Sequence, residues 1–455
     1  MSLGPTGPAG DAGQPRNSPT AEVDVIVIGG GPAGASAAAV LAQAGHRVAV
    51  LEKSRYPRFH IGESLLPASL PLLERLGVAA QVEAIGLVKH GAEFFSPTHA
   101  CSQRFDFAES WNKTLCYAYE VRRSSFDAIL LERAAGLGAQ VVQGCRAREV
   151  EFRGSDGVEV LAQREDGVSQ RWRARYLVDA SGRDTLLGTR LGTKRRNRHH
   201  NSSAMYAHFR DAWRSDDPQR AGDIGIFWFE YGWLWSIPLA DGMTSIGAVV
   251  WPYYMKSRTV PLREFFLQTI ALAPQLAKRL ESAALASDVE ATGNYAYSCR
   301  RAYGDNFLLV GDAYAFVDPV FSSGVMFAMQ GGIAAAEAIG EALRTPARRQ
   351  QAFRRFERRM RHGPRVFSWF IYRMTRPAMR ELFMGPRNIL RMKEALLSLL
   401  AGDIFGTTPI WASLRAFKLV YYARTLAHPR SSLAALRARA RNIRPIQPER
   451  AVAGG

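Results

Sequence analysis

The sequence predicts an α/β fold, and three observations indicate it. Residues 23–28 (VDVIVI) form a short β-branched apolar run, which is typical of a buried parallel strand. A glycine-rich turn follows, then a helix of small residues, and then a second strand over residues 47–51. The parallel-strand pattern returns at residues 307–310, ahead of a helix over residues 324–343. We therefore expect a Rossmann-type parallel sheet assembled from segments far apart in the sequence.

The glycine-rich turn has a GxGxxG spacing, and each glycine has a physical role. Gly29 permits the tight turn, Gly31 lets the backbone approach a pyrophosphate, and Gly34 lets the helix pack closely on the strand. The phosphates would lie at the helix N-terminus, where unpaired N–H groups point. Glu52 ends the second strand, where a carboxylate can accept hydrogen bonds from ribose hydroxyls. These residues predict a dinucleotide site, although they do not distinguish NAD from FAD.

The middle of the chain has a different pattern. Between about residues 91 and 298, alternating strand-like stretches occur with few long helices, and they predict an inserted mixed β-sheet. Strands are expected over residues 158–162, 204–209, 224–229 and 244–250. Residues 21–345 then form one cofactor-binding module, to which 91–135 and 200–298 contribute a substrate-side sheet. Residues 1–20 are expected to be a disordered tail, and 346–455 a basic, mainly helical segment.

The net charge of +18 belongs to the C-terminal part of the chain. Residues 341–455 contain 24 Lys and Arg against 6 Asp and Glu, which leaves 35 of each sign in the first 340 residues. This asymmetry indicates an acidic carrier protein, an anionic membrane surface or a nucleic acid as partner, or simply a solvated arginine-rich surface. Nucleic acid is disfavoured because no basic groove with interleaved aromatic residues is evident. Membrane contact would involve residues 395–405 and 415–424.

Composition also indicates the cellular compartment of the protein. The four cysteines are scattered, without a CxxC pair or a metal-binding spacing, and are typical of a reduced cytoplasmic protein that holds no metal. No window has the 18 or more uncharged apolar residues that a membrane-spanning helix needs. The first twenty residues lack the apolar core of a signal peptide.

Two later elements favour FAD. Asp179 follows an apolar strand, and Gly311 and Asp312 follow another one ahead of a helix. With the GxGxxG turn they resemble the three flavin fingerprints of the superfamily of FAD-dependent aromatic hydroxylases and halogenases. The resemblance implies that Asp312 binds the ribityl chain and that Arg122, or its neighbour Arg123, lies near the flavin. The cofactor-binding residues that it implies are Gly29, Gly31, Ala33, Gly34, Glu52, Lys53, Arg122, Asp179, Gly311, Asp312, Gly324 and Val325.

Four passages within residues 22–345 resemble one branch of that superfamily. They are HIGESLLP (60–67), GLVKHGAEF (86–94), the WxWxIP pattern WLWSIP (233–238) and the FxxPxxSxG pattern FVDPVFSSG (316–324). These passages are similar to flavin-dependent halogenases of the phenol, pyrrole or carrier-bound-substrate type, related to tryptophan halogenases. The implied fold is an aromatic-hydroxylase-like Rossmann-type FAD-binding domain with an inserted mixed β-sheet substrate domain and a C-terminal helical segment. The motif and tunnel residues are Trp233, Trp235, Ile237, Pro238, Phe316, Pro319, Phe321 and Ser322.

Halogenase chemistry explains why such residues are needed. Reduced flavin (FADH2), O2 and chloride or bromide yield hypohalous acid, a small oxidant that the protein must keep from water and present to one carbon. The resemblance implies that Lys89 presents it, by hydrogen bonding or as a haloamine, from an apolar tunnel that lowers the pKa of the lysine. Ser323 and Gly324, at a helix start, would bind the halide. The ordinary alternatives are a surface lysine, core tryptophans and a helix-capping serine.

One departure from the family pattern narrows the substrate. Tryptophan halogenases carry a glutamate immediately before the first serine of FxxPxxSxG, whereas this chain has Phe321. The departure favours an electron-rich phenol- or pyrrole-like ring, as in antibiotic biosynthesis, either free or tethered to an acidic acyl or peptidyl carrier protein. Residues 366–383 would then cover the active-site mouth or dock the carrier.

The resemblance also implies a separate flavin reductase that supplies FADH2. Two alternatives share the flavin fingerprints: an aromatic hydroxylase reduced by NAD(P)H, and a reductase resembling geranylgeranyl reductases, which would need neither oxygen nor halide.

Overall fold

The structure of the chain is a computed structural model that describes residues 20–99, 101–197, 200–293 and 296–443. The tail expected to be disordered therefore lies outside the described residues, apart from Thr20. Among the described helices, none combines the length and apolar character that crossing a bilayer requires.

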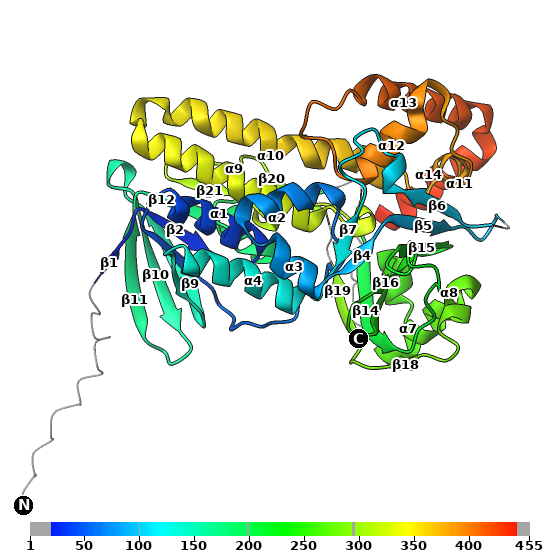
Figure 1. Ribbon diagram of the computed structural model, residues 1–455, viewed down its shortest axis with the longest axis horizontal. Helices are drawn as coiled ribbons and strands as arrows, with labels where there is room; N and C mark the ends of the chain where they lie inside the picture. The colour runs from blue at the N-terminus through cyan, green and yellow to red at the C-terminus, as the bar shows by residue number, and fades with distance from the viewer. Residues whose placement is uncertain (1–19, 100, 198–199, 294–295, 444–455) are drawn as a thin grey trace, which may run out of the picture.

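A five-stranded parallel sheet forms the body on the left of Figure 1. Its order is β21-β12-β2-β3-β8, and all four neighbouring pairs are parallel. The bounds are β2 (Val25–Ile28), β3 (Val48–Leu51), β8 (Gln140–Val142), β12 (Tyr176–Asp179) and β21 (Phe307–Leu309). β2 and β3 are wholly buried, as their β-branched sequences predict. The sheet thus combines segments nearly 300 residues apart, and the predicted Rossmann-type core is confirmed.

Three helices pack together beside this sheet: α1 (Pro32–Gln43), α4 (Arg123–Gly136) and α9 (Gly324–Arg344). α1 begins three residues before the run of small residues that predicted it, because proline is tolerated in the first helical turn. The backbones of α1 and α9 are in direct contact. A Cβ atom on Gly332 would lie 2.1 Å from the carbonyl oxygen of Ala33, so this contact requires glycine.

A smaller sheet of order β1-β11-β10-β9 flanks the parallel sheet. Its strands are β1 (Ala21–Glu22), β9 (Cys145–Phe152), β10 (Val158–Arg164) and β11 (Ser169–Ala174). Two further small sheets join the body to the rest of the chain. The first pairs β4 (Leu87–Lys89) with β7 (Ala118–Glu120), and the second has the order β13-β20-β22, over Lys194–Arg196, Tyr297–Cys299 and Ala315–Phe316.

The inserted sheet has eight strands in the order β18-β14-β17-β16-β15-β5-β6, with β19 also paired to β14. Its strands are β5 (Gly91–Phe95), β6 (Gln103–Asp106), β14 (Ser203–Arg210), β15 (Ile224–Phe229), β16 (Gly232–Pro238), β17 (Met243–Val250), β18 (Ala284–Leu285) and β19 (Glu290–Gly293). β5 pairs with β15 in parallel and the other pairs are antiparallel, so the predicted mixed sheet is confirmed. Its outer helices are α6 (Pro252–Lys256), α7 (Leu262–Ala271) and α8 (Pro274–Arg279).

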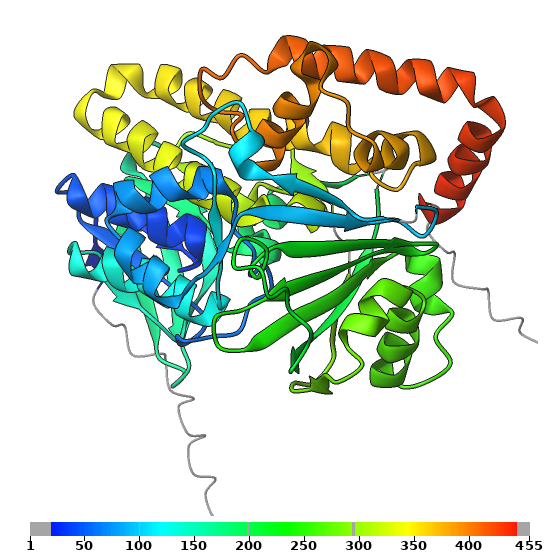
Figure 2. The same cartoon turned by 45° about the vertical axis from the view of Figure 1, so that its right-hand side comes forward.

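The C-terminal segment folds over both bodies, as Figures 1 and 2 show. Its helices are α10 (Arg349–Ile371), α11 (Pro377–Met384), α12 (Met392–Leu400), α13 (Trp411–Ala427) and α14 (Pro429–Ile443). α12 is buried along its whole length except for its second and third residues, so residues 395–400 are unavailable for the membrane contact considered above. Three further short helices are α2 (Leu70–Leu76), α3 (Ala79–Ile85) and α5 (Leu186–Arg190).

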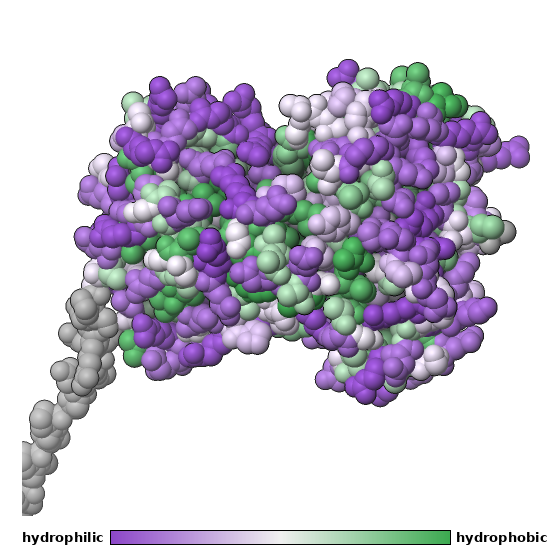
Figure 3. Space-filling model, in the orientation of Figure 1, coloured by the Kyte–Doolittle hydropathy of each residue, from purple (hydrophilic) through white to green (hydrophobic). Residues whose placement is uncertain are grey.

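The outer surface of α13 is different. Figure 3 shows a largely hydrophilic face with hydrophobic residues gathered over this helix. Leu419 and Leu426 are 70% and 80% exposed there, between basic residues. This face could therefore contact an apolar or anionic partner surface.

Candidate active site

The GxGxxG turn connects β2 to α1 with backbone contacts that only glycine allows. Gly29 has φ +100°, and a Cβ atom there would lie 2.3 Å from the carbonyl oxygen of Ala180. A Cβ atom on Gly34 would lie 1.9 Å from the carbonyl oxygen of Gly29. Gly31 is different, since a Cβ atom there would meet only the guanidinium end of Arg58 at 3.4 Å. The first and third glycines are therefore packed against backbone atoms of the protein, whereas the second has space beside it for a ligand.

Glu52 is buried and braces the same turn. Its Oε2 accepts the N–H of Gly30 at 2.6 Å, and its Oε1 accepts the N–H of Ser54 at 2.8 Å. Carboxylate oxygens have further lone pairs, so the ribose contact predicted for Glu52 is compatible with this geometry. Lys53 lies at the surface and pairs with Asp184 at 2.5 Å.

The two later aspartates have contrasting surroundings. Both oxygens of Asp179 accept backbone N–H groups, from Ser181 at 3.0 Å and Leu187 at 2.8 Å, so this side chain holds the loop that faces Gly29. Among the described residues, no hydrogen-bond donor reaches the carboxylate of Asp312. Burial raises the pKa of Asp312 to about 6, against the opposing charges of Arg123 and Arg183. Asp312 therefore has acceptors left for a ligand.

The two adjacent arginines point to different partners. Arg123 is buried, forms a two-bond ion pair with Asp127 and interacts electrostatically with Asp312. Arg122 is partly exposed and pairs with Asp241 at 2.6 Å. Of the two arginines that the sequence left open, Arg123 is the one that the fold directs toward Asp312.

Arg58 was missed by sequence reasoning. Its Nη2 lies 3.3 Å from Asp127, whereas its Nη1 is buried without a hydrogen-bond partner among the described residues. An unpaired guanidinium nitrogen beside the open Gly31 suits a pyrophosphate, and the donor-free Asp312 suits a polyol chain. The residues present therefore fit FAD. No motif distinguishes Arg58 from its neighbour Arg55, which forms a surface ion pair with Glu165.

Lys89 is the last residue of β4 and its side chain is 1% exposed. Its Nζ donates to the Oγ of Ser64 at 2.7 Å and to the carbonyl oxygen of Leu65 at 3.0 Å. The ring centroid of Phe107 lies 5.5 Å from the ammonium group. Burial lowers the pKa of Lys89, because desolvation disfavours the ammonium form. The alternative of a surface lysine is therefore wrong.

Glu120 stands beside this lysine and was also missed. It ends β7, the antiparallel partner of β4, and its Oε1 lies 3.8 Å from Nζ of Lys89. The hydroxyl of Ser64 donates to the same oxygen at 3.2 Å. Burial raises the pKa of Glu120 to about 8, although the nearby charge of Lys89 acts to lower it. No signal in the sequence marks Glu120, because its pairing arises from strand register.

The WxWxIP residues, Trp233, Trp235, Ile237 and Pro238, all lie in the buried strand β16. Trp233 and Trp235 are two residues apart on one face, with ring centroids 5.9 Å apart. The ring of Trp235 crosses β17 directly above Gly247, where a Cβ atom would lie 2.2 Å from the ring. The indole N–H of Trp235 donates to the Oγ of Ser245 at 3.2 Å, so these rings at least pack the core. Their proximity to flavin stays a prediction.

The FxxPxxSxG residues lead into α9. Phe316 ends β22, Pro319 begins a short 3₁₀ turn, and Ser322 adopts a left-handed conformation with φ 54°. Ser323 occupies the N-cap position but makes no side-chain cap, and a Cβ atom on Gly324 would meet nothing within 4 Å. The start of α9, including Val325, therefore keeps the open N–H groups that the predicted halide site requires.

An aromatic cluster lies between β5, β6 and the helices of the C-terminal segment. It consists of Phe94, Phe105, Trp228, Phe321, Phe367 and Phe383. Phe383 of α11 contacts Phe94 and Phe105 on one side and stacks on Phe321 on the other, with centroids 5.3, 5.4 and 6.3 Å away. Phe107, which faces Lys89, follows Phe105 by two residues. A chain of ring contacts thus leads from Phe105, two residues before Phe107, through Phe383 to Phe321, just before the start of α9.

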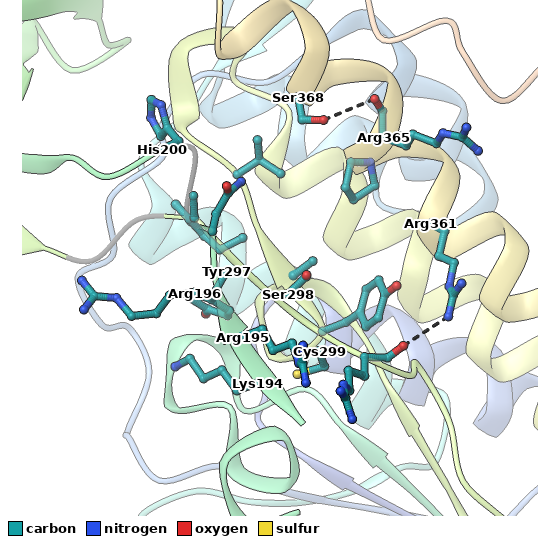
Figure 4. Close-up of a pocket in the computed structure, with 18 of the residues that line it drawn as sticks. Lys194, Arg195, Arg196, His200, Tyr297, Ser298, Cys299, Arg361, Arg365 and Ser368 are labelled. Atoms are coloured by element: carbon teal, nitrogen blue, oxygen red, sulfur yellow. Dashed lines mark hydrogen bonds between the residues drawn. The ribbon is translucent and has the colours of Figure 1, made fainter. Parts of the chain in front are cut away.

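A separate basic cleft of about 1540 Å³ opens between α10 and the small sheet β13-β20-β22. Its cationic lining residues are Lys194, Arg195, Arg196, Arg300, Arg361 and Arg365, and no aspartate or glutamate lines it among the residues that the structure describes. Figure 4 shows the side chain of Arg361 on α10 reaching toward the small sheet, where it donates to the carbonyl oxygen of Arg300 at 3.1 Å, whereas the side chain of Arg365 points away from Lys194 to Arg196. Lys89 does not line this cleft. His200 does, and it also lines a small second cavity with Trp233 and Asp318.

Comparisons with known proteins identify the family of the chain. The FAD binding domain family matches residues 22–366. A 1H-pyrrole-2-carbonyl-[peptidyl-carrier protein] chlorinase from Pseudomonas fluorescens is 31% identical over 85% of this chain and 90% of its own length. A flavin-dependent halogenase from Armillaria mellea is 33% identical over 72% of this chain and 69% of its own length.

Among solved structures, a myxobacterial FAD-dependent halogenase, the chondrochloren halogenase, is similar with a TM-score of 0.75. It is 32% identical, and the match covers 86% of this chain and 93% of that one.

Proposed function

The chain belongs to the flavin-dependent halogenases, and from this premise we propose that it halogenates a phenol- or pyrrole-like ring with Lys89 presenting the oxidant. The burial of Lys89 carries the proposal. The Lys89 side chain is 1% exposed and is fixed by two hydrogen bonds. Burying a charged group costs several kcal/mol before its interactions are counted, so a catalytic role explains this lysine better than packing does. The hydroxylase and prenyl-reductase alternatives share the flavin fingerprints but give such a lysine no role.

FAD, when bound and reduced, supplies with O2 the oxidising power that converts chloride or bromide into hypohalous acid. We assign the pyrophosphate to the open Gly31 and to Arg58, and the ribityl chain to Asp312 beside Arg123. Arg123 thus takes the place first given to Arg122, because Arg122 already pairs with Asp241. Glu52 would accept from the ribose. A separate flavin reductase would supply the reduced cofactor.

The start of α9 would bind the halide. The N–H groups of Ser323 and Gly324 face no side-chain cap, and a helix N-terminus favours an anion. Lys89 would then hold the hypohalous acid through its ammonium hydrogens or carry the halogen on its nitrogen. The aromatic cluster would exclude water from the space between the two sites.

Phe321 supports an electron-rich substrate. Its ring packs between Phe367 and Phe383, so the position holds no carboxylate that could take a proton from an indole intermediate. A phenol or pyrrole activates its own ring through its heteroatom. The relative from Pseudomonas fluorescens is named for a pyrrole held on a peptidyl carrier protein.

The decisive experiment is incorporation of bromide measured by mass spectrometry. Purified protein receives FAD, a flavin reductase, NADH, O2, bromide and a panel of phenols and pyrroles, both free and carrier-bound. We expect a brominated product from the wild type and a loss of about 100-fold or more in Lys89→Ala, as for removal of a group that acts on the transition state. Lys113→Ala, which changes an exposed lysine, is the matched control. A hydroxylated product without bromination would contradict the proposal.

The basic cleft supports delivery of the substrate by an acidic carrier protein. Its six cationic residues, with no acidic residue in the described part of the lining, give the charge complementarity that such a partner needs. Opposite charges at an exposed interface are screened within about 8 Å at physiological salt, so binding should weaken as salt rises. We expect Arg361→Glu/Arg365→Glu to weaken carrier binding about tenfold or more while turnover of a free phenol is kept.

The alternative use of this charge is an anionic membrane surface, contacted through α13. Cosedimentation with phosphatidylserine vesicles distinguishes the two partners. Vesicle binding that Leu419→Ser/Leu426→Ser abolishes, together with a salt-insensitive turnover of carrier-bound substrate, would contradict carrier docking.

A further inference from the structure

The residues around Lys89 form a hydrogen-bonded relay that the proposed function leaves unexplained. Lys89 Nζ donates to Ser64 Oγ at 2.7 Å, and Ser64 Oγ donates to Glu120 Oε1 at 3.2 Å. Glu120 is fully buried, and its other oxygen, Oε2, has no hydrogen-bond partner among the described residues. A buried carboxylate with an unused oxygen costs free energy, so a structural role alone accounts poorly for it.

Three chain segments hold this relay in place. Lys89 faces Ala118 across the β4–β7 pair, and Glu120 lies two residues further along the same face of β7. The small side chain of Ala118 leaves room for the lysine to extend toward Glu120. The 62–66 segment lies along the other edge of β7, through a bridge between Ser64 and Glu120 and a hydrogen bond from the Leu65 N–H to the Tyr119 carbonyl at 3.0 Å. The serine hydroxyl is therefore fixed between the two charged groups.

We propose that Glu120 is the proton partner of Lys89 and that the two side chains share one proton through Ser64. In one form Lys89 is an ammonium and Glu120 a carboxylate, and in the other Lys89 is an amine and Glu120 a carboxylic acid. The exchange breaks one N–H bond at Nζ and one O–H bond at Oγ, and forms one O–H bond at Oγ and one at Oε1. No net charge enters or leaves the buried site. Glu120 acts through Lys89 and is thus a positioning residue.

The burial of both groups is consistent with this exchange. Desolvation lowers the pKa of Lys89 and raises that of Glu120 to about 8, so the neutral and the ionised forms of the pair approach each other in free energy. Two other carboxylates face the relay. Asp223, which pairs with Arg104 at 2.6 Å, and Glu63, which lies 3.0 Å from Nε2 of His208, contribute negative charge that raises the pKa of Glu120.

The proposal deepens the halogenase function and rests on it. A lysine that can be either ammonium or amine can donate a hydrogen to hypohalous acid, or present a nitrogen lone pair to it, without exchanging a proton with solvent. The oxidant would meet the same site in either form. Water is excluded around Lys89 and Glu120, which are 1% and 0% exposed.

The first test titrates Lys89 directly and needs no turnover. The holoprotein is labelled with lysine carrying ¹³C at Cε, and the Lys89 signal is assigned by its loss in Lys89→Met. Glu120→Gln removes the neighbouring negative charge, so the ammonium form loses its support and the pKa of Lys89 falls. We expect a fall of at least one pKa unit, which is about a tenfold change in the protonation equilibrium. Glu159→Gln, which changes a buried carboxylate of β10 in another sheet, should leave the Lys89 signal unchanged.

The second test compares pH–rate profiles for bromination. In Glu120→Gln, the limb of the pH–rate profile that reports the pKa of Lys89 should move to lower pH by as much as that pKa falls in the first test. Glu120→Asp keeps the charge, so its pH–rate profile should lie close to that of the wild type. Ser64→Ala should lower kcat without shifting the pH–rate profile. A uniform fall at every pH, or a Lys89 pKa unchanged in Glu120→Gln with FAD binding intact, would overturn the proposal. Failure of the wild type to brominate would instead contradict the halogenase function, because the titration does not depend on it.

Discussion

Phe321 determines which chemistry its surroundings can support. Its ring lies at 14° to that of Phe383 and packs edge-on against Phe367, in a position where a tryptophan halogenase carries a glutamate. A carboxylate at this position would lie against the rings of Phe367 and Phe383. The residue therefore ties substrate preference to the packing of the C-terminal segment.

We expect Phe321→Glu to lower the free energy of unfolding by about 2–4 kcal/mol, because it buries a polar group without donors. Phe321→Leu keeps the site apolar and should cost about 1–2 kcal/mol. Denaturant unfolding of the two variants measures the difference. Equal stabilities, or a gain of tryptophan halogenation by Phe321→Glu, would show that the cluster can accommodate a charge.

We expect His60 to make the stability of the protein sensitive to acid. Burial and the positive charge of Arg123 lower the pKa of His60 to about 4, and its Nδ1 lies 2.7 Å from the carbonyl oxygen of Ile61. The unfolded chain binds a proton near pH 6.5 and the folded chain only near pH 4, so stability is present above pH 6.5 and is lost as pH falls toward 4. For this half-buried residue in the apoprotein we expect a loss of about 2 kcal/mol.

Chemical unfolding of the apoprotein at pH 7 and pH 4.5 tests this expectation. His60→Gln should lose less stability between the two pH values than the wild type. His428→Gln changes an exposed histidine and should behave as the wild type. A wild-type loss that is identical in His60→Gln would assign the acid sensitivity to other groups.

Short motifs predicted the residues whose function depends on local backbone geometry. The conformations and close contacts of Gly29 and Gly34 follow from strand–turn–helix spacing alone. Arg58 and Glu120 could not be predicted, since their partners come from distant segments brought together by the fold. The choice between Arg122 and Arg123 depends on where α4 begins, a boundary that sequence patterns leave uncertain by more than one residue.

At the scale of elements, α11 is part of the core. Phe383 joins β5 and β6 of the inserted sheet to Phe321 at the edge of the FAD body. The arginine-rich composition of this region predicted helices with a solvated surface. It did not predict that α11 packs in the core, because the few apolar residues responsible lie at helical spacing in a region with many charged residues.

Phe383→Ala should remove a fully buried ring and leave a cavity between these elements. We expect a loss of about 3–5 kcal/mol in the free energy of unfolding and weaker halogenation, since the cluster would admit water. Leu426→Ala, on the exposed face of α13, should change stability by less than about 0.5 kcal/mol. Calorimetry and product analysis on the two variants check both effects. A stable, active Phe383→Ala protein would mean that α11 is dispensable for closing the site.

Strand positions were predictable where hydrophobic periodicity is strong. β15 matches its predicted range, and β14 and β17 extend theirs by one or two residues. β4 and β7 were not predicted. Each is three residues long, which is too short for an alternating pattern to be recognised, yet this pair carries Lys89 and Glu120.

At the scale of the whole molecule, the C-terminal segment packs directly on the FAD body. α10 packs along α9, and Phe367 and Phe383 complete a cluster that the first 345 residues leave open. We therefore expect a chain of residues 21–345 to aggregate instead of folding as a free flavoprotein.

Size-exclusion chromatography with FAD absorbance measures the outcome. A chain ending at residue 443 keeps every described helix and should elute as the full-length protein, with FAD bound. A soluble 21–345 chain that retains FAD would show that the basic segment is an independent appendage.

The order of the parallel sheet has a consequence for synthesis in the cell. About 280 residues separate Ile28 in β2 from Phe307 in β21, and Asp312 follows only after that. At ribosomal rates of about 5–20 residues per second, β2 must wait roughly 15–60 s before the strand that completes its sheet emerges. During that time the outer edge of β12, which β21 will pair with, stays open. FAD can gain its full set of predicted contacts only after Val325 has emerged, so we expect a chain stalled before that point to lack part of its cofactor site.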